Sequence, residues 1–109
     1  MRDRREKIGI LKDLKKHLQQ YFGDEILQVI LFGSQTKGTD QSGSDYDVLV
    51  IGKSRINWEI KNKIIDLCYD IDLKYGIIID LHILAESEIN ELRGRQPIYF
   101  NAIETGIRV

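Results

Sequence analysis

The spacing of apolar residues predicts two amphipathic helices in this chain. In each of two segments, apolar side chains recur every three or four positions, which places them on one face of an α-helix. The first segment ends before Gly23 and the second before Gly76, and glycine commonly follows a helix directly. The apolar stripes consist of Ile8, Leu11, Leu14, Leu18 and Tyr21, and of Ile56, Ile60, Ile64, Leu67 and Ile71, the second widened by Ile65 and Cys68.

Three short apolar runs predict buried β-strands. Pro97 favours the start of a last helix, because proline suits the first helical position, and Gly106 ends it. Residues 107–109 could add an edge strand. The order helix, strand, strand, helix, strand, helix predicts one α/β domain over residues 1–109, with a small mixed sheet whose strand order stays open. The first and third predicted strands are residues 26–32 and 77–84. The second starts near Asp45, continues through residues 48–51 and is closed by Gly52.

The composition is that of an ordinary globular domain, with 42% hydrophobic residues, 30% charged residues and a formal net charge of -1. A nearly neutral chain lacks the broad positive surface that holds duplex nucleic acid or an anionic membrane, so neither partner is expected. No apolar run approaches the roughly 20 residues of a membrane-spanning helix. The single cysteine, Cys68, excludes an intrachain disulfide and a cysteine-rich zinc site, and a reducing, cytoplasmic setting is expected.

The stretch FGSQTKGTDQSGSDYDVLV, residues 32–50, places two carboxylates at the start of an otherwise apolar strand. If the first two strands are antiparallel neighbours, the turn at Gly33 and Ser34 lies close to these carboxylates. Alternation along a strand puts Asp45 and Asp47 on the same face. A Gly-Ser turn lets backbone N–H groups approach a phosphate, and carboxylates hold a magnesium ion that bridges to phosphates. The stretch therefore predicts a site for a nucleoside triphosphate with Mg²⁺.

Asp80 interrupts the third and most apolar strand. Two unit charges about 4 Å apart repel by about 4 kcal/mol at an effective dielectric constant of about 20, so clustered carboxylates are unfavourable unless they are protonated or bind a metal. Taken alone, each feature is also typical of a solvated strand edge or a plain loop. Together they favour a metal site formed by Asp45, Asp47 and Asp80. A P-loop is excluded, because Thr39 stands where that motif requires lysine.

Four further side chains have two interpretations each. His82 follows Asp80 by two positions and shares its face, so it could contact a nucleotide or a metal, but a partly buried, hydrogen-bonded strand residue is the more frequent case. Trp58 and Tyr69 lie off the main stripe of the second helix, where packing at the helix edge is preferred over a partner surface. Cys68 is interpreted as a core residue and not as a nucleophile, because no activating histidine is near it in the sequence.

The motif Gly33-Ser34, ten residues, Asp45-Tyr46-Asp47 resembles the signature of the DNA polymerase β-like nucleotidyltransferase superfamily. The short length and the layout resemble its minimal nucleotidyltransferase (MNT) branch, and the resemblance covers most of the chain. It implies the polymerase β-like α/β fold, in which helices pack on a small mixed sheet.

The resemblance also implies roles for individual residues. Asp45 and Asp47 would bind two Mg²⁺ ions, and Asp80 would bind one of them and help to activate the acceptor hydroxyl. The triphosphate of ATP would be held at the turn of Gly33 and Ser34. Many family members have arginine directly after this pair, where this chain has Gln35. Lys37 could supply the missing phosphate contact, and a solvated loop lysine is the competing interpretation.

The activity that the resemblance implies is transfer of a nucleoside monophosphate, AMP from ATP, to a hydroxyl group of a protein, with release of pyrophosphate. Family members of this size are commonly antitoxins paired with a HEPN-domain ribonuclease toxin, and some inactivate that toxin by adding AMP to it. The competing hypothesis is a non-catalytic antitoxin that neutralises its partner by contact and keeps a vestigial nucleotide site. Three retained acidic residues favour the enzyme, Gln35 favours the contact module, and a homo- or hetero-oligomer is compatible with either.

Overall fold

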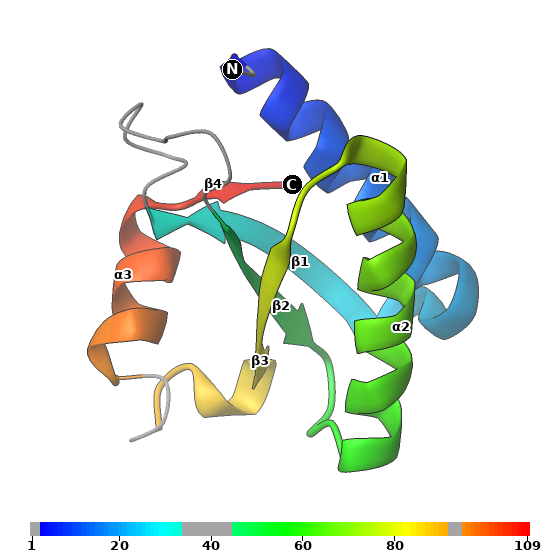
Figure 1. Cartoon of the computed structure of the whole chain (residues 1–109). Coiled ribbons are helices and arrows are strands. Elements are labelled where there is room, and N and C mark those ends of the chain that lie inside the picture. Colours follow the sequence, from blue (N-terminus) through cyan, green and yellow to red (C-terminus); the bar gives the residue numbers. More distant parts are fainter. Residues whose placement is uncertain (1–2, 34–44, 92–94) are drawn as a thin grey trace.

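The structure of the protein is a computed structural model that describes residues 3–33, 45–91 and 95–109 (Figure 1). Its elements follow the predicted order of helices and strands, with a short 3-10 helix after the first α-helix and another after the third strand. Along the chain these are α1 (Arg4–Phe22), η1 (Gly23–Glu25), β1 (Ile26–Phe32), β2 (Tyr46–Gly52), α2 (Trp58–Tyr75), β3 (Ile79–Ala85), η3 (Glu86–Glu88), α3 (Pro97–Thr105) and β4 (Ile107–Arg108).

The four strands form one mixed sheet in the order β3-β2-β1-β4. β1 runs antiparallel to β2 and to β4, whereas β2 and β3 are parallel. The antiparallel register pairs Phe32 with Asp47, and the parallel register pairs Asp47 with Asp80. β2 is therefore hydrogen-bonded on both sides, which fixes the backbone of Asp47 between two neighbouring strands.

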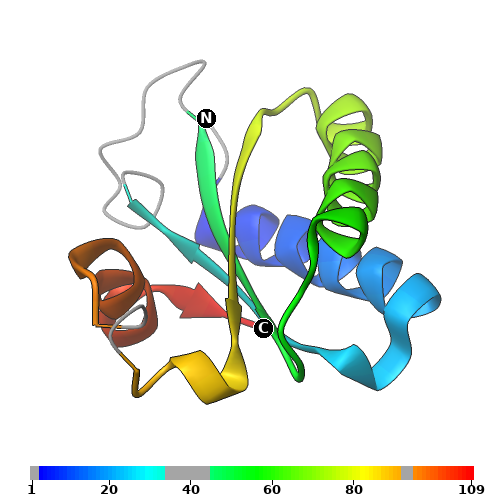
Figure 2. The same ribbon diagram turned by 90° about the horizontal axis from the view of Figure 1, so that it is seen from below.

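The sheet separates two layers of helices. α1 and α2 cover one face and the shorter α3 covers the other (Figures 1 and 2). Successive strand residues alternate between these faces, so Val29 and Leu31 join the larger core beneath α1 and α2, whereas Ile30 and Phe32 join the smaller core beneath α3. The smaller core consists of Ile30, Phe32, Leu49, Ile51, Leu84 and Ala102.

Local capping explains where the two long helices begin and end. The side chains of Asp3 and Asn57 accept hydrogen bonds from the N–H groups three residues later, at 2.8 and 2.9 Å, which satisfies a free donor at the start of α1 and of α2. α2 ends at Gly76, which adopts the left-handed conformation with φ of 64° and donates its N–H to the carbonyl of Asp72. The predicted helix ends at Gly23 and Gly76 are confirmed. No helix within the described ranges is long and apolar enough to cross a membrane.

The predicted apolar stripes are wrong at their edges. Tyr21 and Ile65, which were included in the stripes, are 59% and 44% exposed, and Trp58 and Tyr69, which were expected to pack, are 71% and 58% exposed. Each helix contacts the sheet along a narrow line, and a residue one position away is turned by about 100° around the helix axis. Only part of each apolar stripe therefore reaches the core, and in α2 the buried residues are Ile64, Leu67, Cys68 and Ile71.

Cys68 is expected to resist alkylation in the native protein. Its side chain lies in the larger core with 4% exposure, and burial raises the pKa of its thiol from 9.0 to about 12, with a smaller contribution from Asp72. Because one pKa unit is a tenfold change, the thiolate fraction near pH 8 falls about a thousandfold. Mass spectrometry after iodoacetamide treatment should show modification in urea and none in buffer. Rapid labelling of the native protein would contradict the assignment of Cys68 to the core.

Candidate active site

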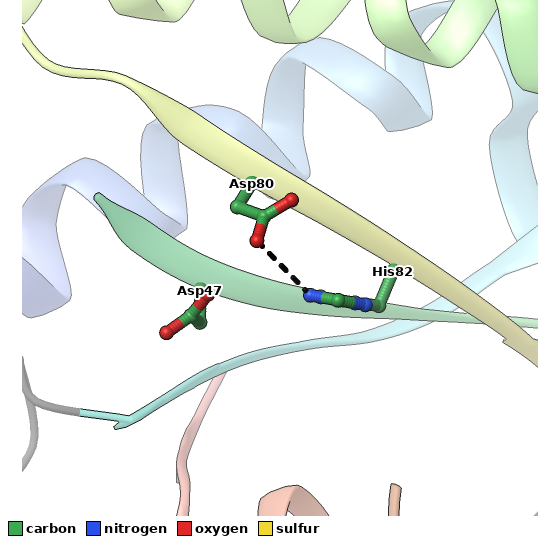
Figure 3. A group of neighbouring side chains, drawn as sticks. All are labelled: Asp47, Asp80 and His82. Carbon is green, nitrogen blue, oxygen red and sulfur yellow. Dashed lines mark ion pairs between the residues drawn. The ribbon is translucent and has the colours of Figure 1, made fainter. Parts of the chain in front are cut away.

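Two acidic side chains and a histidine meet on the face of the sheet that α3 covers. Asp47 lies on β2, and Asp80 and His82 lie two positions apart on β3, so that alternation directs them to the same face. One ligand atom from each of the three residues lies within 4.8 Å of the others (Figure 3). Tyr46, next to Asp47, is buried in the larger core on the opposite face, as the alternation predicts.

The imidazole of His82 is held beside the carboxylate of Asp80. Its Nε2 lies 3.6 Å from Oδ2 of Asp80, which is longer than a hydrogen bond, and its ring packs against Phe32 with 5.4 Å between ring centroids. Nε2 is buried and has no hydrogen-bond partner among the residues that the structure describes. His82 is partly buried as predicted, but the expectation that it is a hydrogen-bonded strand residue is wrong for this nitrogen.

The surroundings of Asp47 disfavour its ionised form. Burial raises the pKa of its carboxyl above the ordinary value of 3.8, and the hydrogen bond and negative charge of Asp80 raise it further. Electrostatic interaction with His82 lowers the pKa of Asp47, and the charge of Asp45 raises it by a smaller amount. Such a pair of carboxylates is stabilised by any cation that lies between them, because the cation removes the repulsion that the burial intensifies.

Gly33 follows β1 and lies against the carboxylate of Asp47, as the antiparallel pairing of β1 and β2 predicts. Its φ is +78°, a conformation that glycine adopts readily and other residues rarely adopt. A Cβ atom built at this position would overlap Oδ2 of Asp47. A residue with no side chain is therefore required here, both by the backbone conformation and by the carboxylate beside it.

The other predicted site residues either lie outside the group of Asp47, Asp80 and His82 or lie outside the described residues. Asp45 directly precedes β2, is exposed, and does not belong to the group of neighbouring ligand atoms found within the described part of the chain. Its predicted metal-binding role stays a prediction. Ser34, Gln35 and Lys37 lie outside the described residues, and the roles predicted for Ser34 and Lys37 stay predictions as well.

The residues of the group fit a divalent cation. Two carboxylates supply the oxygen donors that Mg²⁺ and Mn²⁺ accept, and the buried Nε2 of His82, which has no hydrogen-bond partner in the described structure, is a further donor. Mg²⁺ sites in nucleotide-dependent enzymes often use one or two protein carboxylates and complete their shell with water and substrate phosphates. The absence of a side chain at Gly33 lets the Asp47 carboxylate lie directly against the backbone that follows β1.

Comparison with known protein families identifies relatives over nearly the whole chain. The model of the nucleotidyltransferase domain family matches residues 11–108. Three proteins of Methanocaldococcus jannaschii, whose names assign them provisionally as protein adenylyltransferases, are similar in sequence. MJ1305 is 33% identical over 103 residues, which is 93% of this chain and 69% of that protein. MJ0141 is 39% identical over 74 residues, which is 68% of this chain and 75% of that protein. MJ0604 is 31% identical over 96 residues, which is 88% of this chain and 90% of that protein.

Solved structures with the same fold are also found. A crystal structure of a toxin-antitoxin with AMP-PNP has a TM-score of 0.61 at 17% identity, covering 89% of this chain and 70% of the other. A variant of the toxin-antitoxin MntA-HpeT has a TM-score of 0.59 at 16% identity, covering 98% and 72%. At these identities the likeness shows the fold alone, and together with the family match it confirms the predicted nucleotidyltransferase fold. The family match over residues 11–108 and the M. jannaschii relatives show that this chain belongs to the nucleotidyltransferase domain family.

Proposed function

We propose that this chain, as one domain over residues 1–109, is a Mg²⁺-dependent protein adenylyltransferase that transfers AMP from ATP to a hydroxyl group of a protein partner. The observation that carries the proposal is the register that sets Asp47 beside Asp80 and against Gly33. Membership of the nucleotidyltransferase domain family supports the reaction class, and the names of the M. jannaschii relatives support a protein as the acceptor.

Each residue has a defined part in the proposed reaction. Asp47 and Asp80, with Asp45, hold Mg²⁺, and the turn formed by Gly33 and Ser34 holds the triphosphate, with Lys37 as a further phosphate contact. When bound, the Mg²⁺ ions neutralise the negative charge that builds up on the phosphate oxygens. Asp80 accepts the proton of the acceptor hydroxyl group. The oxygen of that hydroxyl group forms a bond to the α-phosphorus. The bond from the α-phosphorus to the bridging oxygen breaks, and pyrophosphate leaves with that bonding pair.

The fold supports this proposal by holding the two aspartates on hydrogen-bonded strands. Asp47 lies on a strand paired on both sides, and Asp80 lies opposite it on β3. Catalysis of phosphoryl transfer depends mainly on positioning and on electrostatic stabilisation, and strands hold side chains more accurately than loops do.

For the acceptor, we propose a HEPN-domain toxin, with this chain as its antitoxin. The similar folds of proteins described as toxin-antitoxins, one of them crystallised with AMP-PNP, support this pairing. A second candidate is an antitoxin that acts by contact alone. The exposed apolar side chains of α2, namely Trp58, Tyr69 and Leu73, favour it because they offer a surface for a partner protein.

The proposal is tested with ATP labelled at the α-phosphate. The purified protein, Mg²⁺ and a lysate of the host are incubated with this ATP, and parallel reactions contain ATP labelled at the γ-phosphate or EDTA. A labelled protein band is expected with the α-label alone and is expected to disappear with EDTA. A band from the γ-label would indicate phosphotransfer instead. Mg²⁺-dependent ATP binding without any labelled band would favour the contact antitoxin.

A further inference from the structure

We propose that His82 is a third protein ligand of the divalent cation held by Asp47 and Asp80, donating through Nε2. We infer that this nitrogen donor raises the affinity of the site for Mn²⁺ more than its affinity for Mg²⁺. The inference rests on the proposed function, because it concerns the same metal site. The inference assigns a role to His82, which is not one of the predicted acidic ligands Asp45, Asp47 and Asp80.

The first argument is the state of Nε2. This atom is buried and has no hydrogen-bond partner within residues 3–33, 45–91 and 95–109. Buried polar atoms in proteins nearly always have a hydrogen-bond partner, so one whose nearest charged neighbour, Oδ2 of Asp80, is too far away for a hydrogen bond needs an explanation such as a bound ion. The side chain of His82 is 20% exposed, so most of the ring is enclosed by protein.

The second argument is the position of Nε2 relative to the carboxylates. It lies 3.6 Å from Oδ2 of Asp80, and ligand atoms of Asp47, Asp80 and His82 all lie within 4.8 Å of one another (Figure 3). Neighbouring ligand atoms around one octahedral ion are about 3 Å apart, since each is about 2.1 Å from the metal. The three residues therefore have nearly the spacing of a common ligand set before any ion is bound.

The third argument is that the fold holds the ring in this orientation. Phe32 packs against the imidazole at 5.4 Å between centroids, and the same Phe32 is paired with Asp47 across β1 and β2. His82 is paired with Leu49 in the parallel register, one alternation beyond the pair of Asp47 and Asp80. The strands that bring the carboxylates together thus also hold the imidazole next to them.

The imidazole nitrogen of His82 is the reason that we expect the site to favour Mn²⁺ over Mg²⁺. Carboxylate and phosphate oxygens suit Mg²⁺, whereas an imidazole nitrogen is a better ligand for transition metals, whose affinities rise from Mn²⁺ along the series. A site with two carboxylates and one imidazole should therefore favour Mn²⁺ more strongly than a site made of oxygen ligands alone. The competing explanation is that His82 merely offsets the charge of the two aspartates and never contacts the ion.

The composition of the chain makes these explanations distinguishable, because it has only two histidines, His17 and His82. His17 pairs with Asp70 at 2.9 Å between α1 and α2, away from the site, and provides a matched control. Mn²⁺ is bound to the full chain with inorganic triphosphate, which contains no nitrogen, and pulsed EPR records the coupling of Mn²⁺ to directly bonded nitrogen. We expect this coupling in the wild type and in His17→Gln, and its loss in His82→Gln.

Metal affinities provide the second readout. Loss of a residue that only orients a metal ligand lowers the affinity for the metal about 10–100-fold, so loss of a direct ligand in His82→Gln should lower the affinity for Mn²⁺ by at least about tenfold. The affinity for Mg²⁺ should fall less, so the ratio of Mn²⁺ to Mg²⁺ affinity should fall as well. Thermal unfolding shows whether His82→Gln is folded. If it is not, His82→Asn takes its place in both measurements. Bound Mn²⁺ without nitrogen coupling in the wild type would overturn the inference and leave the proposed function standing. Failure of the wild type to bind either ion would overturn both.

Discussion

Replacing Asp47 with asparagine is expected to slow nucleotidyl transfer about a thousandfold while the protein stays folded. Asparagine keeps the size of the side chain but removes the negative charge that would hold the metal in the proposed reaction. A loss of about 4 kcal/mol of transition-state stabilisation corresponds to this factor in rate. The rate is measured as release of pyrophosphate or as incorporation of α-label. The exposed Asp66 of α2 provides the matched acid-to-amide control, and Asp66→Asn should keep the wild-type rate.

The stability of Asp47→Asn separates a functional role from a structural one. Burial and Asp80 raise the pKa of Asp47 above 3.8, so the folded state binds its proton more tightly than the unfolded state does. The contribution of this group to stability is therefore present below pH 3.8 and is lost as pH rises through the raised pKa. At pH 7 in EDTA, the neutral variant should melt at the wild-type temperature or above it. An inactive but strongly destabilised variant would indicate a structural role, and wild-type rates would disprove the metal assignment.

Gly33→Ala is expected to lose at least about a hundredfold in transfer rate and also some stability. Alanine at a φ of +78° costs roughly 1–2 kcal/mol, and its methyl group would overlap the Asp47 carboxylate. The carboxylate must turn away, and misplacement of a catalytic group by about 1 Å can reduce the rate about a hundredfold.

Gly76→Ala is the control that isolates this effect. Gly76 also has a positive φ, of 64°, but an added Cβ would meet no atom within 4 Å. Both variants should therefore show a similar loss of stability in urea unfolding, and only Gly33→Ala should lose activity. Equal transfer rates in the two variants would mean that contact between residue 33 and Asp47 has no importance for the reaction.

Local sequence signals were sufficient for most of the element boundaries. The apolar run of residues 26–32 coincides with β1, and the helices end at Gly23, Gly76 and Gly106 as predicted. The third strand begins at Ile79 instead of residue 77, because an uninterrupted run of β-branched residues has no alternation that marks a start. The order of the strands depends on long-range pairing, about which the pattern of each strand alone contains no information.

Of the three acids that the sequence singled out, Asp47 and Asp80 belong to the group of neighbouring ligand atoms in the described structure and Asp45 does not. Asp47 and Asp80 stood out as charges in apolar strands, yet their adjacency follows from a parallel register that only the assembled sheet shows. For His82, the two-residue spacing from Asp80 predicted a shared face. That its Nε2 lacks a hydrogen-bond partner in the described structure depends on the packing of Phe32 and on the distance to Asp80, which no local pattern encodes.

The unequal covering of the two sheet faces has a consequence for how the molecule opens. One face lies under helices of 19 and 18 residues, whereas the face with Asp47 and Asp80 lies under the nine residues of α3. Segments that bury less apolar surface open locally at lower free energy, so the backbone amides of α3 should exchange with deuterium well before those of α1 and β2. Because the strands also belong to the larger core beneath α1 and α2, they should keep Asp47 and Asp80 in register while α3 opens.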